Sequence, residues 1–153
     1  MRIKIIAVGK IKETYFTDAI KEYQKRLNGM CDLQLIEVKE VNFDDINRNI
    51  NDEGKNILDK VEANDYLISL EIKGKELESN ELATFIENHY TFDSRTLTFV
   101  IGGSNGLSND VIKRSNMHLS FGRFTYPHQL MRVILIEQIY RSMMIINNKS
   151  YHK

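Results

Sequence analysis

The stretch VIGGSNGL, from Val100 to Leu107, places three glycines within five residues, directly after an apolar run. Glycines this dense after a strand allow a backbone to approach a ligand closely. No lysine follows them, so the loop lacks the Gly-Lys-Ser/Thr end of a phosphate-gripping loop. Its spacing also fails the G-x-G-x-x-G pattern of a dinucleotide site, which follows an early strand. The loop therefore favours a ligand other than a phosphate.

Outward from this loop, short apolar runs alternate with helical patterns along the whole chain. Strands are expected at residues 3–8, 33–38, 66–72, 97–101 and 118–121, and helices at 15–27, 46–61, 81–89, 108–114 and 127–146. Asp44 or Asp45, Ser79 and Ser108 can cap three of these helices. The alternation predicts an α/β fold, a five-stranded mainly parallel sheet with helices on both faces. The length fits a single domain over residues 1–153.

The expected strand order places three segments on one rim of this sheet, because ligands of open parallel sheets bind beyond the carboxyl ends of the strands. These segments are residues 70–74, 102–106 and 121–126. The last contains Phe121-Gly122-Arg123, a second turn with a small residue. Two walls made largely of backbone suit a flat, mostly uncharged ligand such as a nucleoside.

The net charge of zero hides an uneven distribution of charge. Residues 32–93 carry 16 acidic and 6 basic side chains, whereas residues 111–153 carry 7 basic side chains and Glu137 alone. This asymmetry indicates an anionic partner at the basic end. No stretch approaches the roughly 20 apolar residues of a membrane helix, and no secretory signal is apparent. We therefore expect a cytoplasmic protein without a membrane segment, and the spacing of ligating residues predicts no metal site.

The last helical pattern, residues 127–146, leaves almost no polar face. A helix that is apolar all round must be covered on several sides. The fifth helix of an open sheet should lie on the outside, so we expect a second copy of the chain to cover it and form a homodimer.

Five segments together resemble the RlmH family. They are IIAVGKIKE near the N-terminus, LEIKGK, the loop VIGGSNGL, LSFGRFTYPHQLMRVILIEQIYR and the terminal SYHK, and the resemblance covers the chain from Met1 to Lys153. Members of this family are SPOUT-class methyltransferases that modify N3 of a pseudouridine in large-subunit ribosomal RNA. The asparagine-rich residues 42–56 give this comparison no firm anchor.

The resemblance implies S-adenosylmethionine as the cofactor, a C-terminal trefoil knot, and a homodimer with the active site at the subunit boundary. It also implies which residues contact the cofactor: Leu70, Gly102, Phe121, Gly122, Arg123, Phe124, Thr125 and Tyr126. These residues fall on the same three rim segments that the strand order predicts.

The reaction needs a group that activates the weakly acidic N3–H of the base. The candidates are Arg132, Arg141, Tyr151 and His152, of which His152 titrates near neutral pH. Phosphate contacts are expected from Arg114, Arg123, Lys149 and Lys153. A chain without an added RNA-binding module favours a pre-formed target, ribosomal RNA within an assembled ribosome or subunit. Two alternatives remain open: a non-catalytic RNA-binding protein and a nucleotide-binding enzyme of another class.

Overall fold

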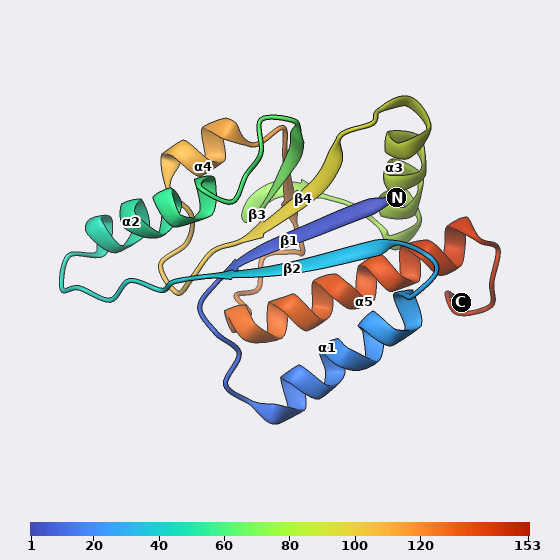
Figure 1. Ribbon diagram of the computed structural model, residues 1–153, viewed down its shortest axis with the longest axis horizontal. Coiled ribbons are helices and arrows are strands. Elements are labelled where there is room, and N and C mark those ends of the chain that lie inside the picture. The colour runs from blue at the N-terminus through green and yellow to red at the C-terminus, as the bar shows by residue number, and fades with distance from the viewer.

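The computed structural model describes residues 1–153 as ten elements arranged around one sheet (Figure 1). The strands are β1 Arg2–Val8, β2 Asp32–Val38, β3 Asp65–Glu76, β4 Thr96–Ile101 and β5 Met117–Ser120. The helices are α1 Thr14–Leu27, α2 Ile46–Leu58, α3 Ser79–Phe92, α4 Asn109–Arg114 and α5 His128–Ile146. The predicted alternation of strand and helix is confirmed.

The sheet has the order β2-β1-β4-β3-β5, and every neighbouring pair is parallel. The predicted mainly parallel sheet is therefore wholly parallel. Parallel strands place their carboxyl ends at the same edge, so the segments that follow β3, β4 and β5 meet there.

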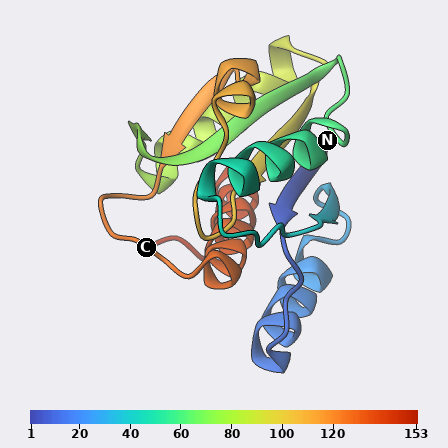
Figure 2. The same cartoon turned by 90° about the vertical axis from the view of Figure 1, so that its left-hand side faces the viewer.

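Helices cover both faces of the sheet, as predicted. In both views α1 and α5 lie together on one side of the strands, with α2 and α4 on the other (Figures 1 and 2). A core of 18 buried residues, including Phe99, Leu135 and Ile139, fills the side of α1, α3 and α5. A smaller core of 7 buried residues, including Ile57 and Val111, lies under α2 and α4.

Two of the three predicted helix caps are confirmed. Asp45 accepts hydrogen bonds from the backbone N–H groups of residues 47 and 48, and Ser108 accepts one from Val111. The prediction for Ser79 is wrong by one residue. Glu78 is the cap of α3 and exchanges hydrogen bonds with Glu81, because a glutamate can complete the reciprocal pairing of a capping box.

Strand β3 is longer than predicted and carries an irregularity that shapes the rim. Leu70 and Lys75 both lie opposite Leu119 of β5, so the residues between them are extra to the pairing. At Gly74 an added Cβ would lie 2.8 Å from the β5 backbone. Glycine therefore lets β3 rejoin β5 after the irregularity, which leaves residues 71–73 at the rim.

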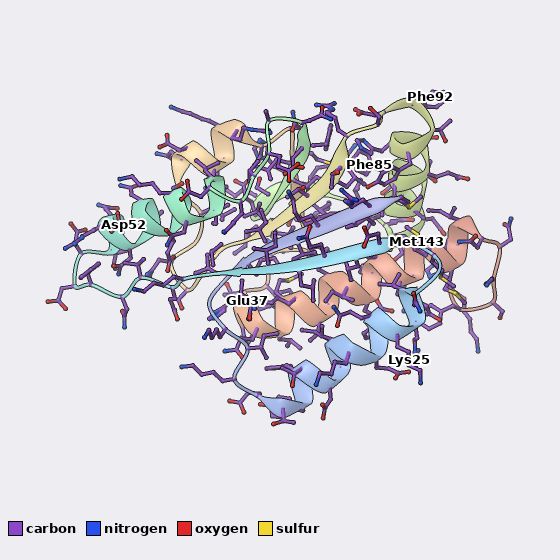
Figure 3. All side chains as sticks on the ribbon, viewed as in Figure 1. Lys25, Glu37, Asp52, Phe85, Phe92 and Met143 are labelled. Atoms are coloured by element: carbon purple, nitrogen blue, oxygen red, sulfur yellow. The ribbon has the colours of Figure 1, made fainter.

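Helix α5 is more enclosed than the sequence suggested. It packs on the sheet and against α1 and α3, and Ile139 and Met143 are at most 1% exposed within a single chain. Figure 3 labels Met143 on α5 close to α1. The remaining face stays partly exposed, with Leu130, Ile134 and Met144 beside Glu137 and Arg141. Only this outer face is free to meet a second copy.

None of the helices is both long enough and apolar enough to cross a membrane.

Candidate functional site

A cleft of about 760 Å³ opens at the carboxyl ends of β3, β4 and β5. This volume is in the usual range for small-molecule sites. Seven of the eight residues predicted to contact the cofactor line it: Leu70, Gly102, Phe121, Gly122, Phe124, Thr125 and Tyr126. Arg123 is exposed and lies outside the wall. The structure thus brings the three predicted rim segments together around one cleft.

The glycine loop forms one wall and is closed on itself. The N–H of Gly106 donates to the carbonyl oxygen of Gly103 at 3.1 Å, and Gly106 has a φ of +89° that other residues adopt only with strain. At Gly102 an added Cβ would lie 3.0 Å from the Gly106 carbonyl group and 3.1 Å from Leu107. A side chain at Gly102 would therefore push Gly106 and Leu107 away and open the loop, even without a ligand in the cleft.

A buried carboxylate supports this loop from behind. Glu53 of α2 is 3% exposed, and its Oε2 accepts a hydrogen bond from the N–H of Val41 at 3.0 Å. Its Oε1 has no hydrogen-bond partner, and burial raises the pKa of Glu53, which favours the neutral acid. An added Cβ at Gly103 would lie 3.1 Å from that oxygen. Contact with Glu53 thus requires glycine at this point of the loop.

Ser120, at the end of β5, fixes the opposite wall. Its hydroxyl group donates to the carbonyl oxygen of Ile72 at 2.8 Å and accepts from the N–H of Gly122 at 3.1 Å. Gly122 has a φ of +102°. The turn after β5 is therefore tied to the irregular part of β3, which holds the two segments in one wall.

The cleft is almost uncharged. Glu71 is the single carboxylate in its wall, and no lysine or arginine lines it. A nucleoside triphosphate or a dinucleotide would find no cation for its phosphates, which argues against the alternative of a nucleotide-binding enzyme. No cluster of His, Cys, Asp and Glu side chains is arranged to hold a metal ion.

A second cluster of functional groups lies at the other end of α5, where the C-terminal residues fold back onto the helix (Figure 1). Glu137 Oε1 accepts hydrogen bonds from Arg141 at 2.5 Å and from the Tyr151 hydroxyl at 3.0 Å. The Tyr151 ring packs against Tyr140 at a centroid distance of 4.8 Å. Tyr151 therefore packs the C-terminal residues against α5, and these residues with Glu137 and Arg141 are called the tail cluster below.

These contacts set the protonation states of the cluster. Burial, together with Glu137, raises the pKa of Tyr151 to about 12, so its phenol stays protonated near neutral pH. The hydrogen bond to Glu137 raises the pKa of Arg141. Arg141 Nη1 lies 3.2 Å from Nδ1 of His152. Because arginine can only donate, Nδ1 is the accepting nitrogen of this contact, which leaves Nε2 as the nitrogen that carries the ring N–H.

The cleft and this tail cluster do not meet within one chain. The cleft takes only His128 and Met131 from α5, and the tail cluster begins at Glu137 and is centred on Arg141. Met131 and Arg141 are ten positions apart on α5, which corresponds to about 15 Å at 1.5 Å per residue. The sequence predicted seven residues of the cleft and Arg141, Tyr151 and His152 of the tail cluster, but not the distance between the two groups.

Arg132 belongs to neither group. Its Nη2 donates to the carbonyl oxygens of Val8 and Gly9 at 2.7 Å, and its Nη1 lies 2.8 Å from Glu37 Oε2. Glu37 is labelled on β2 beside the first half of α5 in Figure 3. Arg132 is 4% exposed, so in this chain it fastens α5 to the ends of β1 and β2. A direct catalytic role for Arg132 has no support in this geometry.

Three of the four residues predicted to contact phosphate lie near one of the two groups. Arg123 is exposed beside the cleft, and Lys149 and Lys153 are exposed near the tail cluster. Arg114 lies at the opposite edge of the sheet, where its Nη2 donates to the carbonyl oxygens of Glu62 and Asp65 at 3.1 Å. Through these bonds Arg114 fastens the end of α4 to the start of β3, away from the cleft.

Sequence reasoning missed the residues that hold the walls in place. Ser120 and Glu53 hold the walls through hydrogen bonds with backbone groups that are distant in the sequence. The spacing of residues along the chain does not reveal such contacts. Glu71 could have been found, because it is an acidic residue directly after a buried apolar run and next to Leu70. Glu137 could have been found as well, since it is the one acidic residue among residues 111–153.

Comparisons with known proteins agree with this arrangement. Residues 1–152 match the family described as "Predicted SPOUT methyltransferase". Proteins called "Ribosomal RNA large subunit methyltransferase H" from Pediococcus pentosaceus and Carboxydothermus hydrogenoformans are 50% and 47% identical to this chain, with all of both chains covered.

Two solved structures share the fold at low sequence identity. A probable methyltransferase from Bordetella pertussis has a TM-score of 0.55 at 11% identity and covers 93% of each chain. A probable methylase family protein from Haemophilus influenzae has a TM-score of 0.53 at 16% identity and covers 99% of this chain and 70% of its own. On its sequence matches, the chain belongs to the SPOUT methyltransferase family and groups there with the ribosomal RNA large subunit methyltransferases H.

Proposed function

We propose that this protein transfers a methyl group from S-adenosylmethionine to N3 of a pseudouridine in large-subunit ribosomal RNA. The full-length relatives named as large-subunit ribosomal RNA methyltransferases support the substrate class. The observation that carries the proposal is the nearly uncharged cleft at the rim, where the predicted cofactor residues converge.

The walls of the cleft fit an adenosyl group held mainly by backbone. Gly102 and its loop form one side and residues 121–126 the other, with Leu70 between them. Such walls offer N–H and C=O groups that can pair with an adenine ring without a cation. The bound cofactor supplies an activated methyl group on a sulfonium centre, and the protein must then align it with the base. The trefoil knot that accompanies such a site in this family stays a prediction here.

The tail cluster carries the groups suited to the base. The N3–H of a uracil-like ring is a weak acid, with a pKa of about 9 to 10, near that of a tyrosine or lysine side chain. The Arg141 cation and the Nε2–H of His152 can stabilise the anion that forms when N3 loses its proton. Tyr151 offers a ring on which a base can stack. For His152 to act as the base itself, Arg141 would first have to release Nδ1.

A second copy of the chain would complete the site. Because the cleft and the tail cluster lie about 15 Å apart along α5, one chain does not present both to the same base. The partly exposed outer face of α5, with Ile134 and Met144, is available for contact with a partner. In a homodimer the tail of one subunit would meet the cleft of the other, and each pair would form one active site.

Exposed cations beside both groups fit an RNA substrate. Arg123, Lys149 and Lys153 can contact phosphates, which give affinity without reading sequence. A surface with so few cations is too small to select one nucleotide in free RNA. The target would therefore be ribosomal RNA within an assembled ribosome or subunit.

The direct test uses labelled S-adenosylmethionine and ribosomes from a strain that lacks this gene. We expect one methyl group per ribosome, found on N3 of a pseudouridine after digestion of the large-subunit RNA. Binding of the RNA without any transfer would instead support the non-catalytic RNA-binding alternative. Tight binding of ATP with no binding of S-adenosylmethionine would contradict the proposed cofactor.

A further inference from the structure

Glu71 is the one carboxylate in the wall of the cleft, and its partner His118 lies outside that wall. It follows Leu70 in the irregular part of β3, and its side chain is 22% exposed. A carboxylate in such a place opposes any anionic ligand and attracts a cation, because the apolar walls weaken the screening by water. At this position Glu71 therefore favours binding of a ligand that carries a positive charge.

The carboxylate of Glu71 is held rigidly on one side only. Its Oε2 accepts a hydrogen bond from the Ser69 hydroxyl at 2.5 Å and lies 2.5 Å from Nδ1 of His118. Ser69 is fully buried, so the contact fixes the side chain against β3 and β5. Its Oε1 takes part in no hydrogen bond within the chain. A fixed carboxylate with one free oxygen in the wall is preorganised to meet a charge on a ligand.

Two ligands of a methyltransferase differ mainly in charge. S-adenosylmethionine carries a positive sulfonium, whereas S-adenosylhomocysteine, the product left after transfer, has a neutral sulfur without the transferred methyl group and is otherwise alike. The backbone walls of the cleft can hold the adenosyl part of both equally well. A carboxylate in the wall can tell them apart by their charge, and Glu71 is the single carboxylate there.

We propose that Glu71 determines the specificity of the cleft for the cofactor by pairing with its sulfonium, and thereby favours release of the product, whose sulfur is neutral. This inference rests on the proposed function, and it goes further by assigning to one side chain the choice between cofactor and product.

The test is calorimetric titration of the wild type and of Glu71→Gln with S-adenosylmethionine, S-adenosylhomocysteine and 5′-methylthioadenosine. Glutamine keeps an oxygen where Oε2 accepts its bonds and removes only the charge. We expect the affinity for S-adenosylmethionine to fall about tenfold, equivalent to about 1.4 kcal/mol. The affinity for the other two ligands should change less than twofold, because neither carries a sulfonium.

Two control variants separate charge from shape. Glu76→Gln removes the same charge from an exposed position on the same strand, outside the cleft, and should leave all three affinities unchanged. Ser69→Ala keeps the charge of Glu71 but removes one of the two contacts that fix its Oε2, so it should weaken S-adenosylmethionine selectively, though less than Glu71→Gln does. An equal loss of all three ligands in Ser69→Ala would instead indicate a distorted wall and a purely structural role.

Equal loss of S-adenosylmethionine and S-adenosylhomocysteine in Glu71→Gln would overturn the inference, since the carboxylate would then meet a part that both ligands share. Unchanged binding of S-adenosylmethionine by the folded variant would overturn it as well. If the wild type bound no S-adenosylmethionine at all, the proposed function would fail and the inference with it, whereas failure of the variant test alone leaves the proposed function standing.

Discussion

The cleft at the strand ends and the tail cluster, both on α5, differ in the kind of groups that form them. The cleft is walled by glycines, apolar side chains and backbone, with a single carboxylate. The tail cluster consists of paired charges and aromatic rings, with Glu137, Arg141, Tyr151 and His152 in mutual contact. The first region is suited to holding a ligand and the second to altering the acidity of a base, so a complete enzyme needs both in one place.

The largest expected effect on methyl transfer comes from removing the C-terminal residues of the tail cluster. Deletion of Tyr151 to Lys153 should lower methyl transfer to ribosomes at least about hundredfold, as is typical when groups that act on the proton are lost. The affinity for S-adenosylmethionine should stay within about twofold, because the cleft does not use these residues. Transfer assays and calorimetry on the same preparation check both statements. Full activity of the truncated protein would show that the tail cluster is only structural.

A substitution in the wall of the cleft should instead lower the affinity for S-adenosylmethionine and leave the tail cluster intact. In Gly102→Val the side chain would press on the Gly106 carbonyl group, and overpacking of about 2 kcal/mol corresponds to about thirtyfold weaker binding of S-adenosylmethionine. Gly29→Val is the control, since Gly29 lies in open space after α1 and outside the cleft, although its φ of +84° makes a side chain there strained. The control should lose stability and keep its affinity. Equal affinity in both folded variants would mean that the glycine loop is merely a turn.

The outer and inner faces of α5 should respond differently to the same substitution. Ile134→Glu places a charge on the partly exposed outer face and should raise the dimer dissociation constant at least about tenfold in a folded chain. Ile139→Glu places it at a fully buried position and should prevent folding, because an unpaired charge enters the core. Sedimentation and circular dichroism distinguish the two. A fully dimeric, active Ile134→Glu would move the interface to another surface.

The smallest effect is expected from the hydroxyl of Tyr151. Tyr151→Phe removes one hydrogen bond to Glu137 and keeps the ring against Tyr140, so activity should fall only about threefold. Because the pKa of Tyr151 is about 12, the phenol stays protonated up to pH 10. The pH profiles of wild type and variant should therefore run parallel from pH 6 to 10. An inflection present only in the wild type would show that Tyr151 titrates in the reaction.

Local patterns predicted most of the fold and the three segments that meet at the rim. The alternation of apolar runs and helical patterns predicted ten elements in the right order, and the positions of Leu70, Gly102 and residues 121–126 after three strands predicted their convergence. The irregularity in β3 was not predictable, because it depends on how closely Gly74 approaches β5. The enclosed position of α5 was missed as well, since apolar residues on all sides do not tell which neighbours cover them.

The roles of single charged side chains were the least predictable part of the site. Arg132 and Arg141 look alike in the sequence, yet one binds backbone carbonyls at the end of β1 and the other faces the tail. Which partner an arginine finds depends on distances set by the whole fold, and no pattern along the chain records them.

The most direct test of the shared site uses dimers of defined composition, purified through two different tags. A dimer of one Gly102→Val chain and one chain lacking Tyr151 to Lys153 should keep one intact cleft facing one intact tail, and so show about half of the wild-type activity. A dimer of one wild-type chain and one chain carrying both changes should be nearly inactive, because each of its sites has one damaged part. The opposite result, with the first dimer inactive and the second half-active, would place cleft and tail of the same chain in one site and contradict the account.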